Sequence, residues 1–320
     1  MNQPHTSPDE PKIERYFSFD HLGKWSVDKL STRDVLFGLL NHGIFAEKVP
    51  PCFTSKGLAV IAEDMLKSLF DEQNERKLAD RLNKKAHDYI RYEALRDINI
   101  PRHLGIPHPE SYAVQALAIQ KHWDEIKVHF GNPMPPVSRV HVRHVGGGRI
   151  FEMNYKGSER YQLQEDEIKW RAGAQFVVKA DIAGCFPSIY SHAIPRALHG
   201  RDIAKRTSGL HKLSGNLLDK CTRNTRDRQT NGLLIGPHAS NIVSEIILTA
   251  IDNELVSKGY TKLNRHIDDY EFFADTYEQA EKFLKELGLN LRAYEMALNE
   301  NIWFLCWIHL YLTDTGTMKV

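Results

Sequence analysis

A pair of adjacent carboxylates limits what this 320-residue chain can fold into more than any other feature of its sequence. Asp268 and Asp269 stand between Ile267 and Tyr270, within a run of strand-forming residues. Neighbouring acids on a strand repel each other, so a fold gains nothing from this placement unless cations neutralise them. We therefore expect the pair to lie in a turn between two strands, at a cation site.

Hydrophobic patterns on both sides of this pair predict a small sheet covered by helices. Residues 175–183 read as a buried strand that leads to Asp181, and residues 262–274 read as strand, Asp-Asp turn and strand. Helices are expected over residues 188–198, 240–256 and 276–299. This order predicts an α+β layer with helices on one face of the sheet.

Asp181, Asp268 and Asp269 form a candidate metal-ligand set. Mg²⁺ prefers carboxylate oxygens and keeps several waters, so two or three aspartates from different strands suffice to hold it. Two such ions roughly 3.5–4 Å apart can clamp a phosphoryl group during transfer. A lone aspartate at a strand end is more often a cap or a turn former, but strand formers flank the Asp-Asp pair. The residues predict two Mg²⁺ ions and nucleotidyl transfer of the polymerase type.

The net charge of +1 conceals a local surplus of positive charge. Residues 196–228 contain nine Lys and Arg against three Asp. No apolar helical face accompanies these charges, so they suit a polyanion such as nucleic acid better than a membrane. The alternative is a solvated basic loop.

Composition and cysteine usage predict a soluble, cytoplasmic protein. The chain is 42% hydrophobic and 26% charged, which is ordinary for a globular protein. Its four cysteines are scattered, without zinc-finger spacing, as in proteins of a reducing compartment. The start of the sequence lacks an apolar signal-peptide core, and the longest apolar run, residues 302–312, is too short to cross a bilayer as a helix. We expect no membrane partner.

The first half of the chain is expected to be mainly helical. Residues 1–14 are polar and predict disorder, and helical patterns over 30–42 and 58–100 predict an N-terminal helical region spanning residues 15–100. A Pro-stiffened extended segment, 102–109, then precedes a helix over 110–129.

A β-hairpin is expected over residues 138–155, with its turn at the glycines 146–148. Arg139 and Arg143 would project to one side of its first strand and form a basic stripe. Such a stripe could contact a triphosphate or a template backbone, or it could be the wet face of an ordinary hairpin.

Three blocks of sequence, in a fixed order, resemble the motifs of one enzyme family. They are residues 178–192 (VKADIAGCFPSIYSH), 229–240 (QTNGLLIGPHAS) and 266–269 (HIDD), and residues 102–109 resemble the finger segment ahead of them. Over residues 100–299 the chain resembles the reverse transcriptases of bacteria, and most closely their defence-associated (abortive-infection) branch. Any one block is weak, whereas the ordered set is specific.

The resemblance implies a right-hand polymerase fold and an RNA-directed DNA polymerase that acts in antiphage defence. Its fingers would span residues 101–175 and its palm 176–299, with an inserted basic fingers segment at about 199–230. Residues 300–320 would be a truncated or atypical tail, so that the thumb is missing or truncated. Implied partners are an RNA template, a DNA or protein primer and dNTPs, and an oligomer is possible.

The resemblance also implies roles for individual residues. Asp181 and Asp268 would hold the metals, Asp269 would add charge and ligation, and the carbonyl of Ile182 would join the second metal. Phe186 would be the bulky gate that excludes a ribose 2′-hydroxyl, or a core residue that anchors the next helix.

Gly232 and Gly236 would let the backbone approach the nucleotide or template closely, although a simple turn before the next helix is the alternative.

The chain departs from the family at three places. His266 replaces the usual aromatic residue, Leu234-Ile235 replaces Pro-Gln, and the lysine-containing strand expected after residue 299 is absent. An alternative function is therefore a catalytically inactive polymerase-like module that binds nucleic acid or a partner. A metal-dependent nuclease is a third possibility, in which the gate at Phe186 would have no use.

Overall fold

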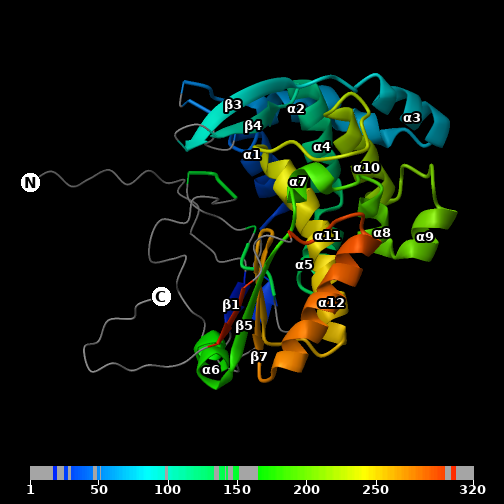
Figure 1. Cartoon of the computed structure of the whole chain (residues 1–320). Coiled ribbons are helices and arrows are strands. Elements are labelled where there is room, and N and C mark those ends of the chain that lie inside the picture. Colours follow the sequence, from blue (N-terminus) through cyan, green and yellow to red (C-terminus); the bar gives the residue numbers. More distant parts are fainter. Residues whose placement is uncertain are drawn as a thin grey trace, which may run out of the picture.

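The computed structural model describes residues 17–19, 25–27, 30–45, 49–50, 52–97, 100–132, 137–140, 142, 147–150, 165–299 and 304–307, and these form a mixed α/β fold (Figure 1). At its centre four antiparallel strands pair in the order β6-β7-β5-β8. They are β5 (Phe176–Asp181), β6 (Leu263–His266), β7 (Asp269–Ala274) and β8 (Phe304–Trp307). The strand predicted over 175–183 and the strand-turn-strand predicted over 262–274 are both confirmed.

Each face of this sheet is covered by different helices, because successive side chains of a strand point to opposite faces. On one face, α12 (Tyr277–Ala293) packs against β5 and β7, and the rings of Phe272 and Phe283 stack at 4.4 Å. On the other face, Trp170 of α6 (Glu165–Gly173) packs on Val177 and Phe273.

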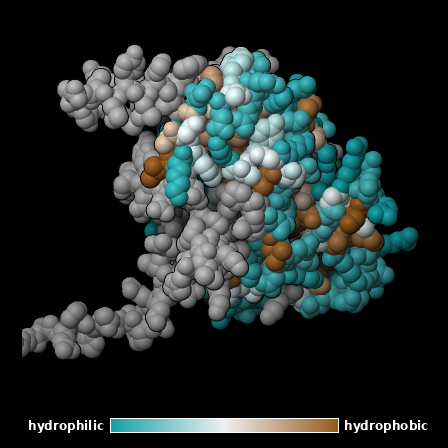
Figure 2. Space-filling model, turned by 90° about the horizontal axis from the view of Figure 1, so that it is seen from below, coloured by the Kyte–Doolittle hydropathy of each residue, from teal (hydrophilic) through white to brown (hydrophobic). Residues whose placement is uncertain are grey.

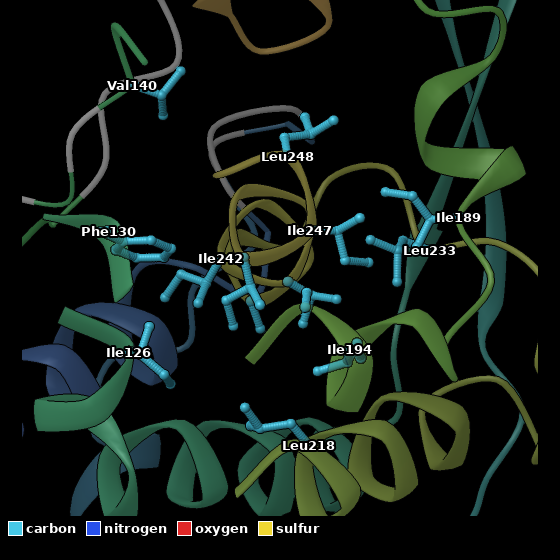
Figure 3. Packing of buried hydrophobic residues seen from close by; sticks show 14 of the residues in the cluster. Ile126, Phe130, Val140, Ile189, Ile194, Leu218, Leu233, Ile242, Ile247 and Leu248 are labelled. Atoms are coloured by element: carbon cyan, nitrogen blue, oxygen red, sulfur yellow. The ribbon is translucent and has the colours of Figure 1, made fainter. Parts of the chain in front are cut away.

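The main hydrophobic core surrounds α11 (His238–Ser257), most of whose residues are buried. Figure 3 shows Ile242 of this helix directed toward Phe130, and Ile247 directed toward Ile189 and Leu233. The neighbours are α4 (Pro109–Lys121), α5 (Trp123–Phe130), α8 (Ala193–His199) and α12. These neighbours enclose α11 on most sides, and this enclosure fixes the helical layer that supports the sheet.

The N-terminal part is only partly helical, which corrects the expectation for residues 15–100. The predicted first helix is α1 (Thr32–Asn41), which begins with a capping box between Ser31 and Asp34. The helix expected over 58–100 is instead broken at residues 72–74 and ends at Asn83. Its parts are α2 (Leu58–Leu66), the 3₁₀ helix η1 (Lys67–Asp71) and α3 (Glu75–Asn83).

Strands follow where that helix was expected to continue. β3 (Ile90–Asp97) pairs in antiparallel register with β4 (Ile100–Ile106). Near the start of the chain, β1 (Phe17–Phe19) pairs in the same way with β2 (Trp25–Val27). Charged residues alternate with larger apolar ones in much of β3, which suits a strand, and pairing with β4 satisfies its backbone. Local helix propensity is overridden by this pairing.

Residues 138 and 139 pair with β6, and the second strand of the hairpin expected over 138–155 lies outside the described residues, so that hairpin stays a prediction. Ser138 forms a parallel bridge to Arg265, and the backbone N–H of Arg139 donates to the Arg265 carbonyl at 2.7 Å. Arg143 and residues 151–155 lie outside the described part of the chain.

The basic segment 199–230 forms two helices, α9 (Arg201–Arg206) and α10 (Ser214–Asn224). A short helix, α7 (Cys185–Ser188), joins β5 to α8. In the part of the chain that the structure describes, no helix has the length and apolar character needed to span a membrane. Figure 2 accordingly shows a face that is largely hydrophilic, with hydrophobic residues in small separate groups.

Candidate metal centre

The sheet brings the three predicted aspartates together at one edge. Carboxylate oxygens of Asp181, Asp268 and Asp269 all lie within 4.8 Å of one another. Asp181 ends β5 directly opposite Asp269, the first residue of β7, and Asp268 lies in the two-residue turn that joins β6 to β7. The carbonyl of Asp268 accepts from the N–H of Ile182 at 3.2 Å, which ties the turn to the end of β5.

The turn that presents Asp268 is strained. Ile267 has φ +59°, a left-handed conformation that a β-branched residue rarely adopts. A two-residue hairpin turn needs positive φ at its first central position, and glycine or asparagine usually supplies it. Strain of this kind costs about 1–3 kcal/mol and persists only where the surroundings enforce it.

Arg265 holds this turn in its strained conformation. Its guanidinium is fully buried and donates through Nη1 to the Ile267 carbonyl at 2.9 Å. Its other N–H groups bind two carboxylates of α11, Glu245 at 2.6 Å and Asp252 at 2.7 Å, and Tyr270 Oη donates to Asp252 at 2.9 Å. A charge can be buried only when it is paired in this way, so the cluster joins α11 rigidly to the hairpin.

The surroundings of Asp268 disfavour the charged form of its carboxyl group. Burial raises the pKa of Asp268 to about 6, and repulsion from Asp269 and Asp181 acts in the same direction. The positive charge of Arg102, on β4, opposes this increase, so that side chain lies near enough to act on the centre. A carboxylate set destabilised by its own repulsion is a site that a divalent cation would relieve.

Three residues of this centre were missed from the sequence: Arg102, Arg265 and Asn299. A charged residue at a core-facing position of β6 was a readable signal for Arg265, because such a residue requires buried partners. No sequence pattern indicated a role for Asn299, because its Nδ2 donates at 3.1 Å to the Oδ2 of Asp181, a residue 118 positions away in the sequence.

Phe186 lies in α7, half-buried against the main core, as expected for an anchoring side chain. Its carbonyl accepts from the N–H of Leu233 at 2.7 Å, which links the first sequence block to the glycine-containing block. Ile182 is buried beside Asp181. The gate assigned to Phe186 and the metal contact assigned to the Ile182 carbonyl stay predictions.

Both glycines of the second block adopt positive φ, and Gly232 is also closely approached by another part of the protein. At Gly232 (φ +86°) a Cβ would come within 2.7 Å of Arg226 Nη1, which donates to the Gly232 carbonyl. At Gly236 (φ +129°) the nearest atom is the carbonyl of Gly105 on β4, 3.7 Å from a Cβ position. Both positions therefore have a conformational requirement, and contact with a nucleotide or template stays a prediction.

Arg139, one residue of the expected basic stripe, is paired within the fold. Its guanidinium forms an ion pair with Glu167 of α6, whose side chain is buried. Burial lowers the pKa of Arg139. A contact between Arg139 and a nucleotide stays a prediction, and it would require release from Glu167.

The basic segment divides into two kinds of residue. On α10 and its C-terminal side, cations bind partners within the fold: Lys220 contacts Asn83, Arg223 contacts Asp219 at 3.1 Å, and Arg226 contacts Gly232. On α9 the side chains are exposed, namely Arg201, Lys205 and Arg206. The cations of α9 are therefore accessible on the surface, whereas much of the remaining positive charge has a structural role.

One further group of described residues has ligand atoms within 4.8 Å of each other: His87, His108 and Glu110. Lys85 already neutralises Glu110, and the imidazoles stack at 3.9 Å with an interplanar angle of 15°. Lone pairs in parallel rings do not converge on one point, so this group is a poorer cation site than the three aspartates.

No family model matches the chain, and no curated protein matches it. Among solved structures, apo telomerase from Candida tropicalis matches with 10% identity and a TM-score of 0.48, over 70% of this chain and 45% of the other. Telomerase from Candida albicans in complex with the TWJ fragment of telomeric RNA matches with 12% identity and a TM-score of 0.39, over 83% of this chain and 47% of the other. The chain thus spans less than half the length of either structure. Likeness at this level is too low to carry a functional conclusion.

Proposed function

We propose that this protein is a metal-dependent nucleotidyltransferase of the reverse-transcriptase type, which extends a primer with dNTPs on an RNA template. The observation that carries the proposal is the convergence of Asp181, Asp268 and Asp269 within 4.8 Å, on a strand end and a strained turn. Their hard oxygen donors fit Mg²⁺, and the raised pKa of Asp268 supports the proposal of a functional centre.

When bound, two Mg²⁺ ions would activate the attacking 3′-hydroxyl and stabilise the leaving pyrophosphate. The three aspartates would hold these ions. Asp268 would act in its ionised form, which a cation favours and which the neighbouring charge of Arg102 assists. Phe186 would exclude a ribose 2′-hydroxyl by steric contact and so favour deoxynucleotides.

From the resemblance of the sequence blocks we further propose a right-hand fold with palm and fingers. We also propose that the protein belongs to the defence-associated branch and has antiphage activity in the cytoplasm. The palm would contain β5, β6, β7, α11 and α12, and the fingers, residues 101–175, would contain most of β4 together with α4 and α5. The exposed cations of α9 would lie along an RNA or DNA backbone. Oligomerisation of the protein is compatible with this arrangement.

Incorporation of labelled dNTPs into a primed RNA template with Mg²⁺ tests the proposal. The wild type is expected to extend the primer, and Asp268→Ala is expected to abolish extension. Asp275→Asn is the matched control, because Asp275 is exposed and paired with Lys262 outside the centre. Parallel reactions with NTPs test the gate at Phe186, and an untemplated reaction tests the need for RNA.

Three outcomes would contradict the proposal. Unchanged extension by Asp268→Ala would show that the carboxylates are not catalytic. A wild-type protein that binds nucleic acid tightly but never extends it would favour the inactive binding module. Cleavage of nucleic acid without nucleotides would favour the nuclease.

A further inference from the structure

We infer that Asn299 is a positioning residue of the metal centre, which orients Asp181 for cation binding. This inference rests on the proposed function, because it assigns a role within the same site. Asn299 Nδ2 donates to Asp181 Oδ2 at 3.1 Å, so one oxygen of that carboxylate is held by a neutral donor.

Backbone pairing places Asn299 at this position independently of its side chain. Residues 297–299 run alongside 181–183: Ala183 N donates to Ala297 O at 2.9 Å, and Asn299 N donates to Asp181 O at 2.8 Å. Ile182 and Leu298 form an antiparallel bridge between these two bonds. The short segment therefore extends the sheet edge at the point where β5 ends.

The turn after α12 directs the chain to this edge. Glu295 adopts φ +62°, and the N–H of Met296 donates back to the Leu291 carbonyl at 3.0 Å. Met296 is buried, and Leu298 packs near Gly288, where a Cβ would lie 3.6 Å from Leu298 Cδ1. The loop that carries Asn299 is thus anchored at several points, and this anchoring fixes the position of Asn299 relative to Asp181.

A carboxamide suits this role better than a charged side chain. A lysine or arginine at the same place would compete with a cation for the carboxylate, and an acid would add repulsion to a centre that already has three acids. An amide N–H holds one oxygen of Asp181 by a hydrogen bond and restricts rotation of the carboxylate, without altering the net charge of the site. Groups that orient metal ligands in this way are commonly worth roughly 10–100-fold in metal affinity or activity.

The test measures binding of Mn²⁺ alone, as a probe of the Mg²⁺ site, by titration calorimetry with the full chain. Asn299→Ala and the similarly sized Asn299→Leu both remove the donor, and both are expected to weaken Mn²⁺ binding by roughly 10-fold or more. The Mg²⁺ concentration for half-maximal dNTP incorporation should rise in parallel. Asn290→Ala is the matched control, because Asn290 Nδ2 donates to the Glu286 carbonyl on α12, away from the centre.

Thermal unfolding in EDTA separates positioning from folding. The midpoint of each Asn299 variant should stay close to that of Asn290→Ala while its Mn²⁺ affinity falls. Mn²⁺ affinity within twofold of wild type in Asn299→Ala would overturn the inference and leave the proposed function intact. Wild-type affinity in Asn299→Leu alone would also overturn it, because packing and not hydrogen bonding would then suffice. Absence of Mn²⁺ binding by the wild-type protein would overturn both.

Discussion

Replacing Asp268 by asparagine should stabilise the metal-free protein. Burial and the neighbouring acids raise the pKa of Asp268 from 3.8 to about 6, so at neutral pH the folded protein must hold an unfavourable charge. The full difference corresponds to roughly 3 kcal/mol. Solvent screening at this half-buried position reduces it to about 1–2 kcal/mol. An asparagine side chain has almost the same shape as aspartate and no charge, so the Asp268→Asn variant avoids this cost.

The sign of the pH dependence follows from the raised pKa. Between about pH 4 and 6 the folded state binds a proton that the unfolded state has released, so this contribution to stability is lost as the pH rises through about 6. The advantage of Asp268→Asn should therefore be complete at about pH 7.5, roughly half as large at about pH 5 and small at about pH 4.

Thermal unfolding in EDTA, from about pH 4.5 to about pH 8, measures the effect. For a chain of this size, about 1–2 kcal/mol corresponds to about 1.5–3 °C in the midpoint. Asp275→Asn, which removes an exposed acid outside the centre, is the control variant. Added Mg²⁺ should raise the midpoint of the wild type and raise that of Asp268→Asn much less. Equal midpoints for wild type and variant at neutral pH, or a gap independent of pH, would refute the charge-crowding explanation.

Two further predictions concern the support of the turn. Arg265→Met leaves Glu245 and Asp252 buried without their cation, and we expect a loss of about 3–5 kcal/mol in urea unfolding; a loss below about 1 kcal/mol would contradict the paired burial. Ile267→Gly removes the strain of a positive φ and should stabilise the fold by about 1 kcal/mol, while a looser turn lowers dNTP incorporation. Destabilisation by that glycine would show that the Ile267 side chain contributes more than its strain costs.

The local elements of the centre were predictable from the sequence. Residues 175–183 contain a buried strand because apolar side chains precede Asp181 almost without interruption, and 262–274 form a hairpin because strand formers flank the Asp-Asp pair. The order of the sequence blocks also indicated that these acids would meet. The strand and the hairpin depend on neighbours within a few residues, which is the range over which sequence patterns determine conformation.

Tertiary structure alone decided which distant groups support the acids. Asn299 reaches Asp181 only because the loop after α12 pairs with the end of β5, and Arg265 is held only because α11 places two carboxylates behind β6. The β3–β4 hairpin replaced an expected helix for the same reason, since strand pairing supplies backbone partners that a local pattern does not reveal. The sequence by itself determined where the carboxylates lie along the chain, whereas packing between remote segments determined how they are held and charged.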